Sequence, residues 1–288
     1  MEVPSGQAVV EAVTTVFVLS TMFSMGVKLS VDRIVDALRD RRLLTNALAV
    51  NLVAVPLLAA LLVRAVPVET GFAAGIVLLA VSPGAPFGPK LAELSDSDVA
   101  FASGLMAILC LLSVVTIPVS LWLLLPGDAA VDPVAIGRMV LNIQLVPLLL
   151  GLGMSFVVPS LAARLHPPVQ RLSDYTFAGL IVLLVVVYSD SLASLVGTGT
   201  LGLSTVAVGA SLLFGYGLGG PARATREVLA TTTAARNAAI ALFIATTGFS
   251  DPNVLTAVLA FSFIGVVWSA LLAGVWRRGS VEAAPLHG

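Results

Sequence analysis

The sequence predicts an all-α integral membrane protein, and three observations lead to that fold class. Of the 288 residues, 58% are hydrophobic and only 11% are charged, whereas soluble domains contain roughly 25% charged residues. Apolar stretches of the length that a membrane-spanning helix needs, about 20 residues, recur along the whole chain. One of these stretches contains a dense run of prolines and glycines, which predicts a helix that is interrupted inside the membrane.

Nine apolar segments are long enough to span a bilayer. They cover residues 7–27, 43–65, 70–93, 98–125, 135–158, 172–192, 198–219, 224–247 and 252–276. Residues 28–42 separate the first two segments and carry apolar side chains at helical spacing, opposite charged ones. This pattern predicts an amphipathic helix that lies at the membrane surface.

The run of helix breakers lies in the third segment, from Ser82 to Lys90, and includes three prolines and two glycines. Proline lacks the backbone N–H of a helix, and backbone groups freed in hydrocarbon need a cavity, water or an ion. The run therefore predicts a binding site, and its candidate residues are Ser82, Gly84, Phe87, Gly88, Pro89 and Lys90. Phe87 either caps the cavity or packs between helices. Lys90 is either a cytoplasmic anchor or a cationic group at the inner mouth of an anion path.

A second polar stretch occupies the centre of the eighth segment, where Thr231, Thr232, Thr233, Arg236 and Asn237 lie. An arginine near the bilayer centre costs at least about 2.5 to 3.5 kcal/mol, so it normally faces a partner or an aqueous cavity. One interpretation is that Arg236 joins the broken helices as a fixed positive charge and attracts an anionic substrate. The alternatives are that it only binds helix-end carbonyls or that it snorkels to the interface. The threonine hydroxyls either face a substrate or bond back to the preceding helical turn.

The distribution of Lys and Arg predicts the orientation, because cytoplasmic connections are enriched in these residues. The odd-numbered connections and the C-terminal tail hold twelve of the fifteen, namely Lys28, Arg33, Arg39, Arg41, Arg42, Lys90, Arg164, Arg171, Arg223, Arg226, Arg277 and Arg278. The even-numbered connections hold Arg64 and Arg138, and Arg236 lies inside a segment. We therefore expect a plasma (inner) membrane protein with its N-terminus outside and its C-terminus in the cytoplasm.

The nine segments also predict an inverted repeat. Four helices in residues 1–125 begin outside, four in residues 172–288 begin inside, and a connecting helix in residues 126–171 turns one unit over relative to the other. The second unit ends in a short cytoplasmic tail. Secondary transporters are commonly built in this way, with interrupted helices of both units meeting near the midplane to form the substrate and ion sites.

Composition and motifs argue against several other functions. The net charge is -1, and we find no Walker loop, dinucleotide fingerprint or zinc-spaced Cys/His cluster, so we expect no nucleic-acid partner and no cofactor. An intramembrane enzyme needs a nucleophile with a base, or a metal site. His166 is expected in a loop and His287 in the tail, where neither has that setting, so we expect no enzymatic activity.

With these residues in view, the chain resembles the bile acid:sodium symporter family over nearly its whole length. The stretch from Met22 to Ser30 is similar to the family's first conserved turn, and Asp98-Val99-Ala100 to the start of its helix after the break. Asn51 with Pro56-Leu57-Leu58 is similar to its Gln-x-x-x-x-Pro-Leu-Leu segment. The resemblance implies a core domain with two crossing helices and a panel domain that moves against it. It also makes Asn51 a candidate site residue, or else a polar bridge between helices.

The positions of the family's sodium ligands are altered in this sequence. The family's Ser-Asn pair after the break falls on Gly88 and Pro89. Its Glu on the crossing helix falls on Thr232 and its Gln on Arg236, whereas the following Asn is kept as Asn237. A guanidinium is always protonated and accepts no hydrogen bond, so it cannot coordinate a cation. We therefore expect that the family-type sodium sites are lost and that Arg236 replaces the bound cation.

Together these features predict a secondary transporter that moves a small organic anion across the lipid bilayer by alternating access. Without sodium sites, its transport is uniport, exchange or proton-linked; sodium symport through backbone carbonyls is the alternative. A third possibility is a transport-inactive membrane sensor or binding protein. Sequence alone leaves the identity of the substrate and the oligomeric state open, because pocket size and shape are encoded only in three dimensions.

Overall fold

A computed structural model describes residues 6–29, 31–125 and 132–282, and all regular structure in these ranges is helical. Eight helices there are long and apolar enough to cross a membrane: Ala8–Lys28, Arg41–Ala65, Val99–Leu124, Pro133–Val157, Pro159–Val187, Thr200–Leu218, Arg223–Gly248 and Pro252–Arg278. A shorter apolar helix covers Thr70–Ala80. The protein is therefore an all-α integral membrane protein, as predicted.

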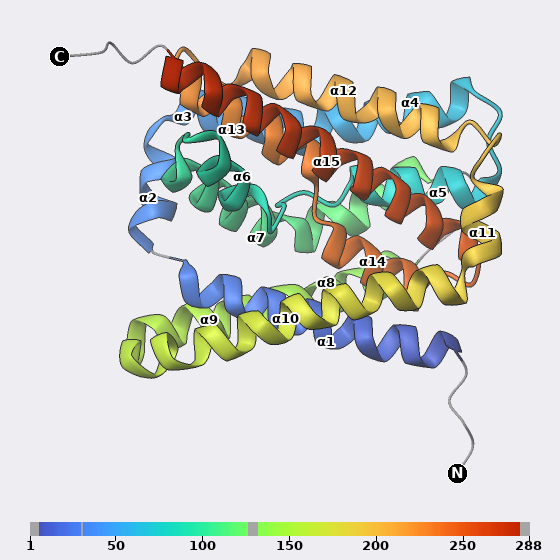
Figure 1. Cartoon of the computed structure of the whole chain (residues 1–288), viewed down its shortest axis with the longest axis horizontal. Helices are drawn as coiled ribbons and strands as arrows, with labels where there is room; N and C mark the ends of the chain where they lie inside the picture. Colours follow the sequence, from blue (N-terminus) through green and yellow to red (C-terminus); the bar gives the residue numbers. More distant parts are fainter. Residues whose placement is uncertain (1–5, 30, 126–131, 283–288) are drawn as a thin grey trace.

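The helices follow one another with short connections. Their bounds are α1 (Gly6–Lys28), α2 (Val31–Arg39), α3 (Arg41–Ala49), η1 (Val50–Ala54), α4 (Val55–Ala65), α5 (Thr70–Ala80), α6 (Gly88–Ser95), α7 (Val99–Leu124), α8 (Pro133–Val140), η2 (Leu141–Leu145), α9 (Val146–Val157), α10 (Pro159–Val187), α11 (Ser189–Ser194), α12 (Thr200–Leu218), α13 (Arg223–Ala235), α14 (Ala238–Gly248) and α15 (Pro252–Glu282). Here η marks a π-helix. The long helices run along the long axis, and α1 begins at the end of the molecule opposite to the one where α15 ends (Figure 1).

Both predicted interruptions are present. The third segment is divided into α5 and α6, and the eighth is divided into α13 and α14. The polar insert after the first segment forms α2, the amphipathic helix that its pattern predicts. The nine-helix count, the inverted repeat and the unit boundaries at 125/126 and 171/172 stay predictions. Parts of those units, residues 1–5, 126–131 and the tail from 283 to 288, lie outside the described residues.

The sixth helix differs from its prediction. The sequence predicts a span over 172–192, whereas α10 begins at Pro159 and only Val158 separates it from α9. Proline is well suited to the first turn of a helix, and the polar first half of α10 was interpreted as a loop because its hydropathy is low. His166 therefore lies in a helix and not in a loop, and the expected boundary at 171/172 falls inside α10.

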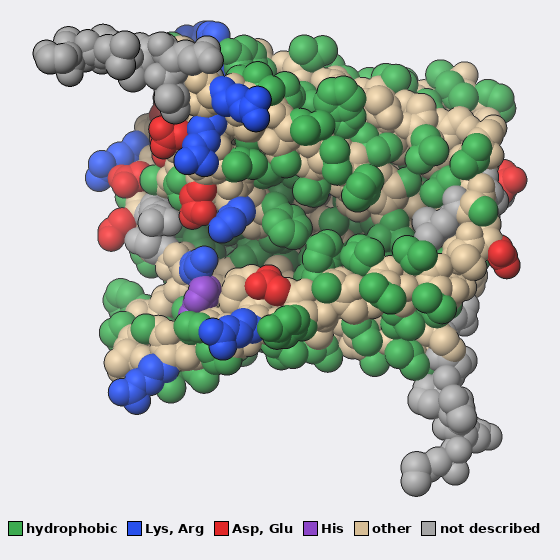
Figure 2. All heavy atoms as spheres, in the orientation of Figure 1, with side chains coloured by type: hydrophobic (Ala, Val, Ile, Leu, Met, Phe, Trp, Pro, Cys, Tyr) green, Lys and Arg blue, Asp and Glu red, His purple; other side chains and the backbone are tan. Residues whose placement is uncertain are grey.

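Charge is unevenly distributed between the two ends of the molecule. On the face shown in Figure 2, the Lys and Arg side chains gather toward the end where α2, α3 and α6 lie. We expect this, because most Lys and Arg residues of the sequence lie in the odd-numbered connections, which share one side of the membrane. Which end faces the cytoplasm stays a prediction.

Helices α1 and α9 pack backbone against backbone. A Cβ atom added to Gly26 in α1 would collide with the Leu148 carbonyl oxygen, and one added to Gly151 in α9 would collide with the Phe23 carbonyl oxygen. Close approach of this kind is how small residues hold membrane helices together, since lipid offers helices no hydrophobic driving force. The two helices therefore form one closely packed pair.

We expect Gly26→Ala to destabilise the protein, because backbone on the facing helix cannot move away as a flexible side chain can. Overpacking typically costs about 1 to 3 kcal/mol, which a thermal unfolding experiment in detergent would detect as a lowered midpoint. Gly153→Ala is the matched control on α9, because nothing lies within 4 Å of its added Cβ. Equal midpoints for the two variants would contradict the close packing of α1 and α9.

A candidate substrate and ion site at two interrupted helices

The break between α5 and α6 follows from its sequence. Leu79 would normally accept a hydrogen bond from the residue four positions later, but that residue is Pro83, which has no N–H. Gly84 has a φ of 85°, a conformation that favours glycine, and an added Cβ would lie 2.9 Å from the Cys110 sulfur. Pro89 then lies in the first turn of α6. The Leu79 carbonyl accepts instead from the Ser82 N–H at 3.0 Å, and after the break the chain restarts as a second helix.

The break between α13 and α14 is centred on Arg236, whose φ of 44° and ψ of 171° lie far from helical values. Non-glycine residues in such sparsely populated regions cost about 1 to 3 kcal/mol and persist only where the surroundings hold them. Asn237 caps α14 by accepting a hydrogen bond from the Ile240 N–H at 3.3 Å. The Asn237 N–H donates to the Ser82 carbonyl at 2.9 Å. The two breaks therefore touch directly through their backbones.

A π-helical turn in η1 supplies a third set of polar groups. The Val55 N–H bonds to the Val50 carbonyl, five residues back, instead of to Asn51. The next residue is Pro56, which cannot donate. The Asn51 carbonyl is thus left without a donor from its own helix, in a protein interior where an unpaired carbonyl is costly.

Arg236 satisfies these groups. Its guanidinium donates to the Asn51 carbonyl at 3.1 Å and to the Asn51 side-chain oxygen at 3.0 Å. It also donates to the carbonyls of Leu79 at 3.4 Å and of Ala80, at the end of α5. The residue is only 1% exposed. One side chain therefore joins the π-turn of η1, the end of α5 and the end of α13.

The electrostatic setting favours a cation at this point. The C-terminal end of a helix carries a partial negative charge, and the guanidinium lies at the C-terminal end of α5, while Arg236 itself is the last cap residue of α13. Carbonyl oxygens of this kind are also ligands that hard metal cations accept. The guanidinium therefore occupies a position whose chemistry would otherwise suit a bound cation.

The other polar residues predicted in this region have structural contacts. Thr231 and Thr232 bond back to backbone carbonyls of α13, and Ser82 bonds back to Leu78. Thr233 accepts a hydrogen bond from the Asn51 amide at 3.1 Å. A Cβ at Gly88 would lie 2.8 Å from the Thr232 methyl group, so this glycine allows α6 to approach α13.

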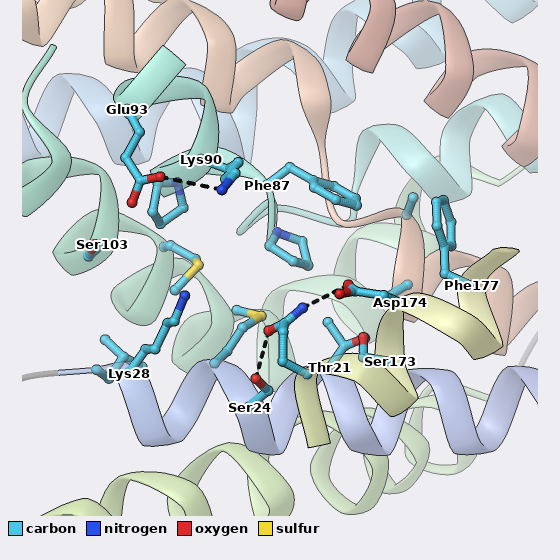
Figure 3. A pocket seen from close by; sticks show the side chains of 18 of the residues that line it. Thr21, Ser24, Lys28, Phe87, Lys90, Glu93, Ser103, Ser173, Asp174 and Phe177 are labelled. Carbon is cyan, nitrogen blue, oxygen red and sulfur yellow. Dashed lines mark hydrogen bonds and ion pairs between the residues drawn. The ribbon is translucent and has the colours of Figure 1, made fainter. Parts of the chain in front are cut away.

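A cavity of about 390 Å³ opens next to the breaks. Its lining residues are Phe17, Thr21, Ser24, Met25, Lys28, Leu29, Pro86, Phe87, Pro89, Lys90, Glu93, Val99, Ser103, Met106, Gln170, Ser173, Asp174, Phe177, Ala238 and Ala239. Of the residues predicted for the site, Phe87, Pro89 and Lys90 line it, whereas Arg236 does not. One wall comes from α1 and α10, and the other from α6, α7 and the start of α14 (Figure 3).

The cavity combines an apolar wall with charged groups. The Phe87 ring lies 6.1 Å from the Phe177 ring, which in turn stacks on Phe17 at 5.1 Å. Lys90 forms an ion pair with Glu93 at 3.6 Å, and Lys28 and Asp174 lie across from them (Figure 3). The first residues of α6 and α14 also line the space, and helix N-termini favour anions.

Sequence reasoning missed two buried polar residues. Gln144 in η2 is fully buried and bonds across to Asn237, and only its position just before Pro147 could have indicated it. Glu227 lies in α13, nine residues before Arg236. It is buried, pairs with Arg223 at 2.6 Å and accepts a hydrogen bond from Ser97 at 2.5 Å. It follows Arg223 by one helical turn, a spacing that indicates such a pair.

Among the described residues, no group of three or more His, Cys, Asp or Glu side chains could hold a metal ion. The one described cysteine, Cys110, is buried and lies 3.5 Å from the Gly84 carbonyl, next to the first break. The oxygen atoms that converge at the crossing are backbone carbonyls and the Asn51 amide, and these already accept from Arg236.

Comparison with known proteins agrees with this architecture. The chain is 34% identical over 131 residues to the probable sodium/metabolite cotransporter BASS3, chloroplastic, of Oryza sativa subsp. japonica, which covers 46% of this chain and 31% of that protein. It is 31% identical over 146 residues to the Arabidopsis thaliana protein of the same name, covering 51% and 34%. The matched part of the chain thus spans about a third of the length of these relatives.

These relatives are named as cotransporters and not as enzymes, in line with the expectation from the sequence. A sequence model described as Sodium Bile acid symporter family matches residues 15–198. That match includes the first break, the π-turns of η1 and η2, and all of the cavity lining except the two residues from α14. Because it covers more than half of the 288 residues, the chain belongs to the Sodium Bile acid symporter family.

Proposed function

We propose that the protein is a secondary transporter of a small organic anion, in which Arg236 is a fixed positive charge that replaces a bound cation. The observation that carries this function is the position of the guanidinium, which donates to the carbonyls of Leu79, Ala80 and Asn51 at the helix crossing. A transported cation would need the same oxygen atoms. Because the Arg236 side chain occupies those oxygen atoms at all times, the helix crossing stays assembled without a bound sodium ion.

The cavity supports an anionic substrate. Lys28 and Lys90 bring two positive charges to its lining and Glu93 and Asp174 bring two negative ones, and the N-terminal ends of α6 and α14 add positive ends of helix dipoles to this balance. The phenylalanine rings provide surface for an apolar body. A carboxylate with a short aliphatic or aromatic portion therefore suits the lining better than a sugar or a cation does.

In the transport cycle we infer, the walls of the cavity separate and close alternately toward the two sides of the membrane. Arg236, buried behind the breaks, keeps the crossing intact during this motion through its bonds to Asn51, and the Asn237 N–H links the second break to the Ser82 carbonyl of the first. A direct contact between Arg236 and substrate would require a state in which the cavity extends to the crossing. We place the protein in the plasma membrane, with the cavity mouth near Lys28 and Lys90 on the cytoplasmic side.

Uptake by proteoliposomes tests this function. The probes are radiolabelled aliphatic and aromatic carboxylates of graded size, each paired with its uncharged amide. We expect saturable uptake of at least one carboxylate and none of the matching amide. Equal uptake of both would contradict the anion preference, and saturable binding without flux would instead identify a membrane sensor or binding protein.

Sodium symport is the rival mechanism, and the names of the two relatives favour it for those proteins. In this chain it would have to use backbone carbonyls other than those that accept from Arg236. An inward sodium gradient in the same proteoliposomes separates the two mechanisms. We expect uptake to be unchanged when choline replaces sodium, whereas dependence on sodium with a defined stoichiometry would favour the rival.

Lys90→Gln should weaken substrate binding. The substitution removes a positive charge from the lining and leaves Glu93 without its ion-pair partner. Because the Lys90 side chain is 81% exposed, the effect is limited to about 1 kcal/mol, or roughly fivefold in KM at low salt. Lys90→Arg is the matched control, since it retains the charge. If both variants had the KM of the wild type, Lys90 would be an anchor at the membrane surface only.

A further inference from the structure

Two cavities lie at opposite ends of one seam between helices. The first contacts Lys28 at the end of α1, and a second, of about 210 Å³, contacts Val10 and Glu11 near its beginning. Along α1 these points are separated by most of a 23-residue helix, so the cavities face opposite ends of the molecule. The second cavity is lined on its other side by residues of α14 and α15, including Thr246 and Leu255.

The seam separates two groups of helices. The first group is α1, the continuous α8–η2–α9 helix and α10, and we call it the panel layer; α1, α9 and α10 lie together along the lower edge of Figure 1. The second group, α5 to α7 and α13 to α15, contains both breaks, and we call it the crossing layer. Backbone contact joins α1 and α9 within the panel layer, and Arg236 joins parts of the crossing layer.

Gln144 bridges the two layers. Its side-chain nitrogen donates to the Cys110 carbonyl at 3.0 Å and to the Ser113 hydroxyl at 2.5 Å. Its side-chain oxygen accepts from the Asn237 amide at 2.9 Å. All of these partners belong to the crossing layer, and Asn237 is part of the second break.

The π-turn fixes the position of this side chain. In η2 the Val146 N–H bonds to the Leu141 carbonyl, five residues back, and Pro147 follows immediately. The extra residue in the turn rotates the helix locally, and Gln144 is fully buried whereas Asn142 in the same turn is exposed. A buried amide whose bonds are broken without replacement is costly, so any sliding of the panel layer must exchange these bonds for others.

We propose that Gln144 is a positioning residue that holds the side chain of Asn237 and fixes the panel layer against the crossing layer, so that Leu255 in the wall of the second cavity stays buried. This inference rests on the proposed transport function, because only a transporter needs the two cavities to open alternately. Movement of the panel layer then begins when the bonds from Gln144 to Asn237, Ser113 and Cys110 are exchanged.

Thiol labelling of single cysteines measures which cavity is open. Leu255→Cys reports on the second cavity, where Leu255 is only 2% exposed, and Val99→Cys reports on the first, where Val99 is partly exposed. Cys110 is buried, so labelling of the wild-type chain gives the background rate. Each substitution is also made without an added cysteine, and labelling of that variant measures any new exposure of Cys110. Gln144→Leu is the test substitution, and Asn142→Leu is the matched change on the exposed side of the same turn.

We expect Gln144→Leu to raise the labelling rate at Leu255→Cys at least about fivefold, equivalent to about 1 kcal/mol, and to lower the rate at Val99→Cys. Asn142→Leu should change neither rate. Rates that rise at both cysteines would show general loosening and overturn the positioning role, as would rates that do not change. If Gln144→Leu does not fold, Ser113→Ala removes one partner of Gln144 instead. We then expect the same pattern, with a higher labelling rate in the second cavity and a lower rate in the first. Unchanged rates would overturn the positioning role.

These measurements need no substrate. If the carboxylate uptake experiment fails while the two labelling rates shift in opposite directions, the positioning role stands and the proposed substrate class is wrong. If uptake succeeds and labelling does not shift, the transport function stands and Gln144 has only a structural role. The two hypotheses therefore fail separately.

Discussion

Arg236→Gln should cause a large loss of stability. The guanidinium donates to the side-chain oxygen and the backbone carbonyl of Asn51 and to the carbonyls of Leu79 and Ala80. The shorter glutamine side chain cannot reach all four acceptors. Hydrogen bonds from charged groups are worth about 1.5 to 3 kcal/mol each, and buried acceptors left unpaired add to the loss. We expect unfolding to become easier by at least about 3 kcal/mol, measured as a lower thermal midpoint.

The control for this variant is Arg226→Gln on the same helix. Arg226 donates to the Gly220 carbonyl at 2.6 Å and lies 5.8 Å from the Tyr216 ring, but it is only partly buried. Its loss should therefore cost clearly less than the loss of Arg236. A stable Arg236→Gln protein that still transports would remove the central role of the guanidinium. If stability falls but the preference for anions is unchanged, Arg236 does not contact the substrate.

Asn51→Leu should have the second largest effect. The Asn51 side chain accepts from Arg236 and donates to Thr233 and to the Ala47 carbonyl. Leucine fills a similar volume but leaves one guanidinium N–H and the Thr233 hydroxyl without this partner. Removing a partner from a buried charged network typically costs about 2 to 5 kcal/mol, and thermal unfolding in detergent measures it.

Asn46→Leu is the matched control, one helical turn earlier on α3. Asn46 donates to the Leu218 carbonyl at 3.2 Å in a more exposed position, so its loss should be small. The double variant of Asn51→Leu and Arg236→Gln should be less destabilised than the sum of the single variants, because both remove the same bond. Additive effects would mean that the two residues do not act as one network.

Much of the fold could be predicted from the sequence. Hydropathy located the spanning segments, and the breaker run from Ser82 to Lys90 located the first interruption, because proline and glycine act on the backbone wherever they lie. The start of α10 could not be predicted from hydropathy. Its first half is polar and largely exposed, so hydropathy predicts a connection there, although Pro159 is suited to the first turn of a helix.

The site was predicted in part. Of the three settings that the sequence leaves open for Arg236, the structure shows contact with helix-end carbonyls, and a contact with substrate stays a prediction. The acceptor on Asn51 could not be inferred, since its carbonyl becomes free only through the π-turn that precedes Pro56. The cavity lies beside the crossing and not at it, so Phe87, Pro89 and Lys90 line it, whereas Thr231 and Thr232 bond back to their own helix and Gly88 lies against Thr232. Gln144 depends on a contact over 93 residues, which no local pattern encodes.

The central claim is that a fixed guanidinium replaces a bound sodium ion at the helix crossing. The thermal midpoint of the wild-type protein, measured as sodium chloride replaces choline chloride at constant ionic strength, tests it most directly, because an ion that binds only the folded state raises the midpoint. We predict a midpoint that does not change with sodium concentration. A midpoint that rises with sodium and saturates would show that the folded protein binds the ion, and it would contradict the replacement of sodium by Arg236.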